Sequence, residues 1–69
     1  DYDKAIKEFN TALTKDPKNA MALQNLIVAY TKKGDAAKAN EAVAKLEAAD
    51  PSNAQIAKLK EEIAKIPAK

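Results

Sequence analysis

The sequence predicts an all-α fold of four helices, arranged as antiparallel helical hairpins that repeat along the chain as a fragment of an α-solenoid. Apolar residues recur at intervals of three and four in four segments, which is typical of amphipathic helices with one buried face. Two turns, at residues 16–19 and 50–53, share the pattern DPxN and lie 34 residues apart. The same offset relates further pairs of identical residues: Asp1 and Asp35, Lys4 and Lys38, and Ala5 and Ala39. One fixed offset of this length indicates an internal helical repeat.

The first predicted helix covers Asp1 to Lys15. Its apolar side is expected to consist of Ala5, Ile6, Phe9, Ala12 and Leu13. Asp1 and Asp3 suit the positive end of the helix dipole, and Lys15 suits the negative end. Pro17 ends the helix, because the residue before a proline is pushed out of helical geometry.

Two predicted helices joined by a tight turn follow, from about Ala20 to Lys33 and from Ala36 to about Ala49. Asn19 and Asp35 are expected to cap their N-termini, and Gly34 is a typical residue after the end of a helix. The predicted buried faces are Leu23, Leu26, Ile27 and Tyr30 on the first of these helices, and Ala39, Ala42, Val43 and Leu46 on the second. On the outside, Glu41 and Lys45 are expected to form an ion pair.

The last predicted helix runs from about Ala54 to Lys65, with Asn53 as its N-cap. Its apolar stripe is Ile56, Leu59, Ile63 and Ile66. A further repeat would need apolar residues near Lys60 and Glu61, so the charges there indicate a terminal helix that caps the array. The same stripe, opposite several lysines, leaves open a helix that lies on an anionic membrane surface. Packing as a cap is the favoured interpretation, because the preceding repeat needs cover.

A further pattern runs through residues 19–53. Its positions are Leu23, Leu26, Ile27, Tyr30, Ala39, Val43 and Pro51, with Gly34 and Asp35 at the turn. This stretch resembles a tetratricopeptide repeat, which is about 34 residues long and follows W-x2-L-G-x2-Y, then A-x3-F, then P. Leu23 stands in place of the Trp, and Ile27 in place of the small residue. An earlier partial copy supplies Ala5, Phe9 and Pro17.

The resemblance implies one unit over residues 1–69. Residues 1–15 would be the second helix of a partial repeat, residues 20–53 a full repeat, and residues 54–66 the capping helix. One side of the first helix would then lack its usual neighbour. Because at least three repeats are usually needed for stability, we expect a marginally stable monomer. The chain begins at Asp1 rather than Met, which is typical of a processed chain or of a part of a longer one.

Composition excludes several classes of function. A chain of 69 residues forms one small domain, whose core seldom supplies more than about 3–5 kcal/mol. The chain contains no Cys, His or Arg, which argues against thiolate or histidine chemistry and against nucleic acid as the main partner. No apolar run approaches the roughly 20 residues that span a bilayer. Glu61 and Glu62 point about 100° apart on a helix, so they cannot act as a carboxylate pair. We therefore expect no enzyme and no metal or cofactor site; the compartment stays open.

The resemblance further implies a protein–protein interaction module, in which the first helix of each repeat lines a concave groove for a peptide segment of a partner. The groove candidates are Met21, Gln24, Asn25, Val28, Thr31 and Lys32 from the middle helix, and Gln55, Lys58 and Glu62 from the last helix. Met and Val offer adaptable apolar contact, and Gln and Asn can hydrogen-bond a peptide backbone.

A structural or assembly role is the alternative. The chain would then be the C-terminal end of a longer repeat array, or would form a homo-oligomer through its open first helix. Substitutions separate the two roles. Gln24→Ala with Asn25→Ala should abolish partner binding, whereas Ile6→Lys or Phe9→Lys should abolish self-association.

Overall fold

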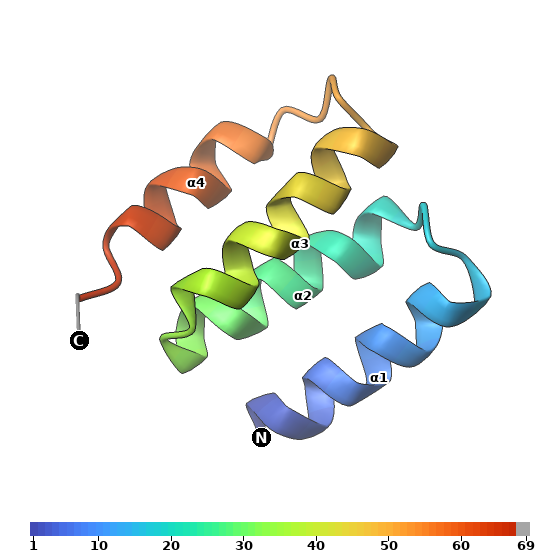
Figure 1. Ribbon diagram of the computed structural model, residues 1–69, viewed down its shortest axis with the longest axis horizontal. Coiled ribbons are helices and arrows are strands. Elements are labelled where there is room, and N and C mark those ends of the chain that lie inside the picture. The colour runs from blue at the N-terminus through green and yellow to red at the C-terminus, as the bar shows by residue number, and fades with distance from the viewer. Residues whose placement is uncertain (68–69) are drawn as a thin grey trace.

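The computed structural model describes residues 1–67, so the last two residues of the predicted unit lie outside the described part. These residues form four helices, each antiparallel to the one before it (Figure 1). Their bounds are α1 Tyr2–Lys15, α2 Ala20–Lys33, α3 Ala36–Ala49 and α4 Ile56–Ala64. The predicted all-α class of a helical-repeat fragment is confirmed.

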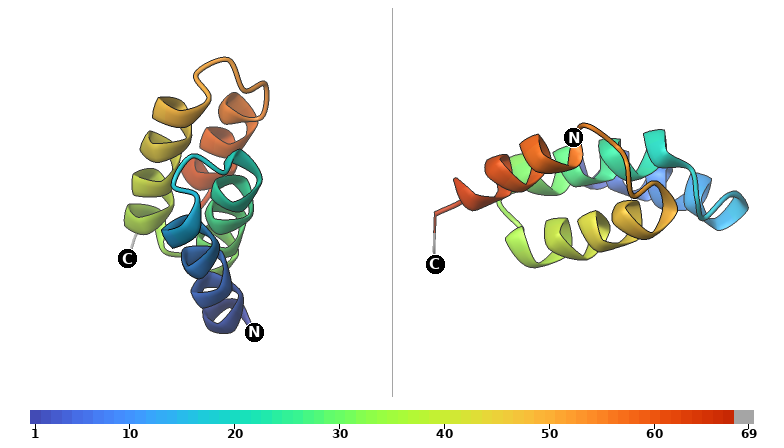
Figure 2. Two further views of the ribbon diagram at one scale, coloured as in Figure 1. Left: turned by 90° about the vertical axis from the view of Figure 1, so that its right-hand side faces the viewer. Right: turned by 90° about the horizontal axis from the view of Figure 1, so that it is seen from above.

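Helix α2 is the centre of the molecule. It packs against each of the other three helices, whereas α1 packs on α2 alone and α4 packs on both α3 and α2. Figure 2 shows the same arrangement from the side and from above, with α3 beneath a layer formed by α1, α2 and α4. Within the layer, α1 and α4 lie on opposite sides of α2, and α3 covers the face beneath.

Helices α2 and α3 begin and end as the sequence predicts, and α1 begins at Tyr2, one residue later than predicted, with Asp1 as its N-cap. The side chain of Asp1 accepts hydrogen bonds from the backbone N–H groups of Asp3 and Lys4, at 3.0 and 3.3 Å. Asn19 accepts from Ala22 at 3.1 Å, and Asp35 accepts from Lys38 at 3.0 Å. These bonds satisfy N–H groups that the helix itself leaves free.

Gly34 ends α2 in the left-handed conformation, with φ of 87°. Its N–H donates to the carbonyl of Thr31, and the N–H of Asp35 donates to the carbonyl of Tyr30. The reversal satisfies two terminal carbonyls and leads the chain directly into α3, and glycine adopts this φ without steric cost.

The start of α4 differs from the prediction. Asn53 does not cap the helix: its side-chain oxygen accepts from the N–H of Gln55 at 2.8 Å, and its carbonyl accepts from the N–H of Ile56 at 3.2 Å. These bonds form a tight turn, so α4 begins at Ile56 rather than Ala54, and it ends at Ala64 rather than Lys65. The side-chain amide of Asn53 also donates to Asp50 at 3.1 Å, which holds it in the turn.

The core lies where α1, α3 and α4 meet α2. Leu23, Ile27 and Leu46 are the largest fully buried side chains. All four predicted residues of α3 are buried, and so are Leu26 of α2 and Ile56 and Ile63 of α4. The stripe of α4 therefore packs into the protein, which favours the capping interpretation over a membrane surface. No helix within residues 1–67 has the length and apolarity that crossing a membrane requires.

Helix α1 is covered less completely. Ile6 is 9% exposed and belongs to the core, whereas Ala5, Phe9, Ala12 and Leu13 are only half-buried. The expectation that Ile6 lies on an open side is therefore wrong, because Ile6 packs into the core cluster with residues of the other helices. Phe9 is the better probe of that side.

One predicted ion pair is also corrected. Glu41 lies 3.8 Å from Lys38, its neighbour three residues earlier, and not within ion-pair distance of Lys45, which borders a cleft between α1 and α3. Both partners are largely exposed, so the pair contributes little stability. Two further pairs join different helices: Lys60 of α4 with Glu47 of α3 at 2.8 Å, and Lys33 of α2 with Asp3 of α1.

Candidate functional site

A groove of about 330 Å³ lies between α2 and α4. We call it the α2/α4 groove; it is lined by Val28, Thr31 and Lys32 of α2 and by Gln55, Lys58, Leu59 and Glu62 at and in α4. Spacings of three and four residues put each set on one face of its helix. The two helices run in the same direction (Figure 1), so the groove follows both of them.

The lining combines an apolar base with charged edges. Val28 is 40% exposed, and Leu59 is half-buried beside it in the groove. The hydroxyl of Thr31 donates to the carbonyl of Ile27 at 2.7 Å, so its donor is already used within the helix. The groove therefore presents apolar surface from Val28 and Leu59 and polar groups from the surrounding side chains.

Electrostatically, the groove carries more positive than negative charge. Within residues 1–67, no carboxylate lies at ion-pair distance from Lys32 or Lys58. Glu62 is 3.9 Å from Lys65, and both side chains are largely exposed, so this pair is weak. The lining thus carries two ammonium groups against one carboxylate.

The structure brings together most of the predicted groove residues. Val28, Thr31, Lys32, Gln55, Lys58 and Glu62 border one space. Met21, Gln24 and Asn25 do not border it. They lie earlier on the same side of α2, before the point where α4 begins. Met21 is 72% exposed, Asn25 is exposed and Gln24 is half-buried, so this part of α2 continues the surface beyond the groove.

Leu59 also lines the groove, although its spacing from the other apolar residues predicts only a place in the buried stripe of α4. It lies four residues after Gln55 and three before Glu62, so it belongs to both faces of α4. This spacing is the feature of the sequence from which its place in the groove could have been predicted. Its contribution is apolar, and it supplies the counterpart of Val28 on the opposite wall.

The groove has the character of a binding surface. Its side chains supply ammonium and amide donors, one carboxylate and apolar contact. Among residues 1–67, no group of three or more His, Cys, Asp or Glu side chains is placed to hold a metal ion.

The repeated hairpin and the groove between alternate helices define a helical-repeat protein. The family model described as tetratricopeptide repeat matches residues 1–63, and the chain belongs to this family. Comparisons with curated proteins and with solved structures gave no match. Tetratricopeptide repeats are protein–protein interaction modules and are typically not catalytic.

Proposed function

We propose that the α2/α4 groove binds a peptide segment of a partner protein. The observation that supports this most directly is the meeting of residues from two helices, far apart in the sequence, around one groove of about 330 Å³. Exposed Val28 and half-buried Leu59 supply apolar contact, while Lys32, Lys58 and Glu62 supply charge. An apolar base with polar edges is the usual composition of a specific protein interface.

The bound segment would extend along α2 beyond the groove. Met21, Gln24 and Asn25 continue the same side of α2 toward its N-terminus, and within residues 1–67 no hydrogen bond occupies the side chains of Gln24 and Asn25. These amides can pair with a peptide backbone, and Met21 offers a flexible apolar contact. In this proposal α4 forms one wall of the site, and the first half of α2 is open.

The repeat plan in this proposal is that of the predicted domains. Residues 1–15 serve as the second helix of a partial repeat, residues 20–53 as a full repeat, and residues 54–66 as the cap. Support for the cap comes from Lys60, whose ammonium pairs with Glu47 of α3 at 2.8 Å, and from Glu61, which is exposed. A following helix would have to displace this ion pair and bury both charges, which is costly.

A peptide-display selection tests the binding function. The wild-type chain should enrich a set of related peptides. Val28→Glu should weaken their binding by at least about tenfold, because it places a charge in the apolar part of the groove. Lys58→Glu should weaken it as much, because it replaces a positive charge that faces the ligand by a negative one. Ala44→Glu is the matched control, since Ala44 is exposed on α3 and lines neither wall of the groove. Equal losses from Ala44→Glu, or none from the groove variants, would refute the proposal.

Self-association through α1 is the second candidate, and the incomplete cover of that helix supports it. Ala5, Phe9 and Ala12 are half-buried, whereas the residues 34 positions later, Ala39, Val43 and Leu46, are buried. In this case sedimentation equilibrium of the wild type would give a dimer, and Phe9→Lys would give a monomer of unchanged helicity. A concentration-independent monomer would exclude this role for the chain.

A further inference from the structure

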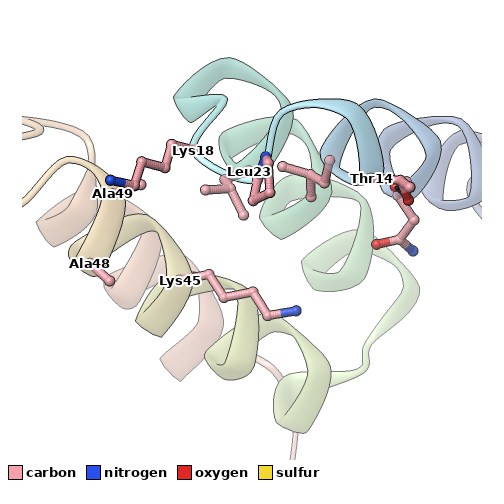
Figure 3. A pocket seen from close by; sticks show the side chains of 9 residues that line it. Thr14, Lys18, Leu23, Lys45, Ala48 and Ala49 are labelled. Carbon is pink, nitrogen blue, oxygen red and sulfur yellow. Dashed lines mark hydrogen bonds between the residues drawn. The ribbon is translucent and has the colours of Figure 1, made fainter.

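A second and larger cleft lies on a different face of α2 from the α2/α4 groove. Helices α1 and α3 both pack on α2 but not on each other, and the space between them has a volume of about 550 Å³ (Figure 3). We call it the α1/α3 cleft. Its apolar lining consists of Leu13, Pro17, Leu23, Ala48 and Ala49.

The cleft is explained by the residues that line it. Leu23 occupies the position where the repeat pattern has Trp, and its side chain is much smaller than an indole. Across from it, α3 contributes only Ala48 and Ala49, whose methyl groups fill little of the remaining space. Leu23 itself is fully buried, so it forms the floor of the cleft, and its neighbours in α1, the turn and α3 form the part of the lining that faces solvent. An apolar space that is open at the surface favours occupation by an apolar group from outside.

The cleft continues along α2. A smaller space of about 240 Å³ shares Asn10 and Lys45 with it and reaches Leu26 and Tyr30, one and two turns further on. Lys38 and Glu41 also line this space, and they pair with each other at 3.8 Å. Together the two spaces form a track between α1 and α3. A short segment of chain can therefore lie in the track while one of its side chains enters the cleft.

Two lysines stand at the cleft. Figure 3 shows Lys18, from the turn before α2, and Lys45, from α3, on either side of the space around Leu23. Within residues 1–67, neither ammonium has a carboxylate at ion-pair distance. Carboxylates of a bound segment could therefore form ion pairs with these two lysines. An ammonium near an aromatic ring would add a favourable cation–π contact.

We propose that the α1/α3 cleft binds one aromatic side chain carried by an acidic segment of a partner protein. The apolar lining takes the ring, and Lys18 and Lys45 take the flanking carboxylates. This site shares no residue with the α2/α4 groove, so a partner can engage either surface without occupying the other.

A synthetic peptide tests the proposal. The probe is acetylated and amidated Glu-Glu-Trp-Glu-Glu, whose indole fluorescence is free of background because the chain contains no Trp. Addition of the wild-type chain should give a saturable blue shift as the ring leaves water. A Lys-Lys-Trp-Lys-Lys peptide should give no saturable shift, and Glu-Glu-Ala-Glu-Glu should not displace the probe.

Variants locate the binding site. Ala48 is exposed, so Ala48→Phe should fill the cleft without disturbing the fold and should weaken binding of the probe by at least about tenfold. Lys45→Glu should weaken binding as much, because its carboxylate repels those of the probe. Ala44→Phe, one turn earlier on α3, is the matched control and should bind as the wild type. Circular dichroism checks that each variant is folded.

Several results would overturn the proposal. These are the absence of a saturable shift with the wild type, unchanged binding by Ala48→Phe, and equal losses in Ala48→Phe and Ala44→Phe. Displacement of the probe by the peptide without Trp would show that charge alone attracts it, and would also overturn the proposal.

Discussion

Phe9 of α1 and Val43 of α3 occupy equivalent positions 34 residues apart, yet Val43 is 3% exposed and Phe9 is half-buried. The difference follows from their neighbours. Helix α3 forms a hairpin with α2 and is also covered by α4, whereas α1 has only α2 beside it. The two copies of the repeat thus share a pattern but not an environment, and the stability of the chain should be concentrated in α2 and α3.

Leu46→Ala tests where the stability lies. Leu46 is 0% exposed, so its truncation should cost about 2–5 kcal/mol, which is comparable to the whole stability of so small a domain. Leu13→Ala should lower the free energy of unfolding clearly less, because Leu13 of α1 is only half-buried. Urea unfolding followed by circular dichroism measures both. Equal costs at the two positions would contradict the unequal cover of the helices.

Gly34→Ala tests the turn between α2 and α3. A Cβ at this position meets no atom within 4 Å, so the whole cost comes from the backbone φ of 87° and should be about 1–2 kcal/mol. Gly34→Asn should be better tolerated, since Asn adopts this conformation more readily than Ala. Thermal unfolding distinguishes the two variants, and an Ala variant as stable as the wild type would show that the turn carries no such strain.

Asp3 should control the titration of Lys33. The hydrogen bond from Lys33 to Asp3, together with the charge of Asp3, raises the pKa of Lys33 above its ordinary value of 10.5. A raised pKa of a lysine means that the ion pair stabilises the folded state fully below pH 10.5 and is lost as the pH rises through the folded-state pKa. In Asp3→Asn, the Lys33 pKa measured by NMR should fall. An unchanged value would mean that the two side chains are apart in solution.

Leu23→Trp should fill the α1/α3 cleft from the inside. If the indole enters the space beside Ala48 and Ala49, the variant should be more stable by about 0.5–2 kcal/mol, with blue-shifted Trp emission. Thermal unfolding and fluorescence test both. A loss of about 1–3 kcal/mol, the usual cost of overpacking, would show that the cleft cannot take a ring beside the backbone of α2.

The sequence predicted the helices well because their signals are local. Asp1, Asn19 and Asp35 cap helices through bonds to residues two or three positions away, and the apolar spacing alone identifies α3 as a buried helix. The two DPxN turns show the limit of such signals. The two turns share the same residue pattern, but Asn19 caps a helix, whereas Asn53 is hydrogen-bonded to Asp50 and forms a tight turn.

The site was predicted less completely, because it depends on how one helix lies along another. Periodicity placed Val28 and Lys32 on one face of α2, and Gln55 and Lys58 on one face of α4. It could not show which turns of the two helices meet. The start of α4 at Ile56 brings its first residues beside the second half of α2 and leaves the first half open.

The most direct test of peptide binding in the α2/α4 groove is an NMR titration of the isotope-labelled chain with a peptide enriched by display. The proposal predicts that the amide shifts which change most belong to residues 28–32 and 55–62, with smaller changes toward Met21, and that Val28→Glu removes them. Changes confined to α1 and α3, with the groove amides unmoved, would contradict it and would assign the partner to the α1/α3 cleft.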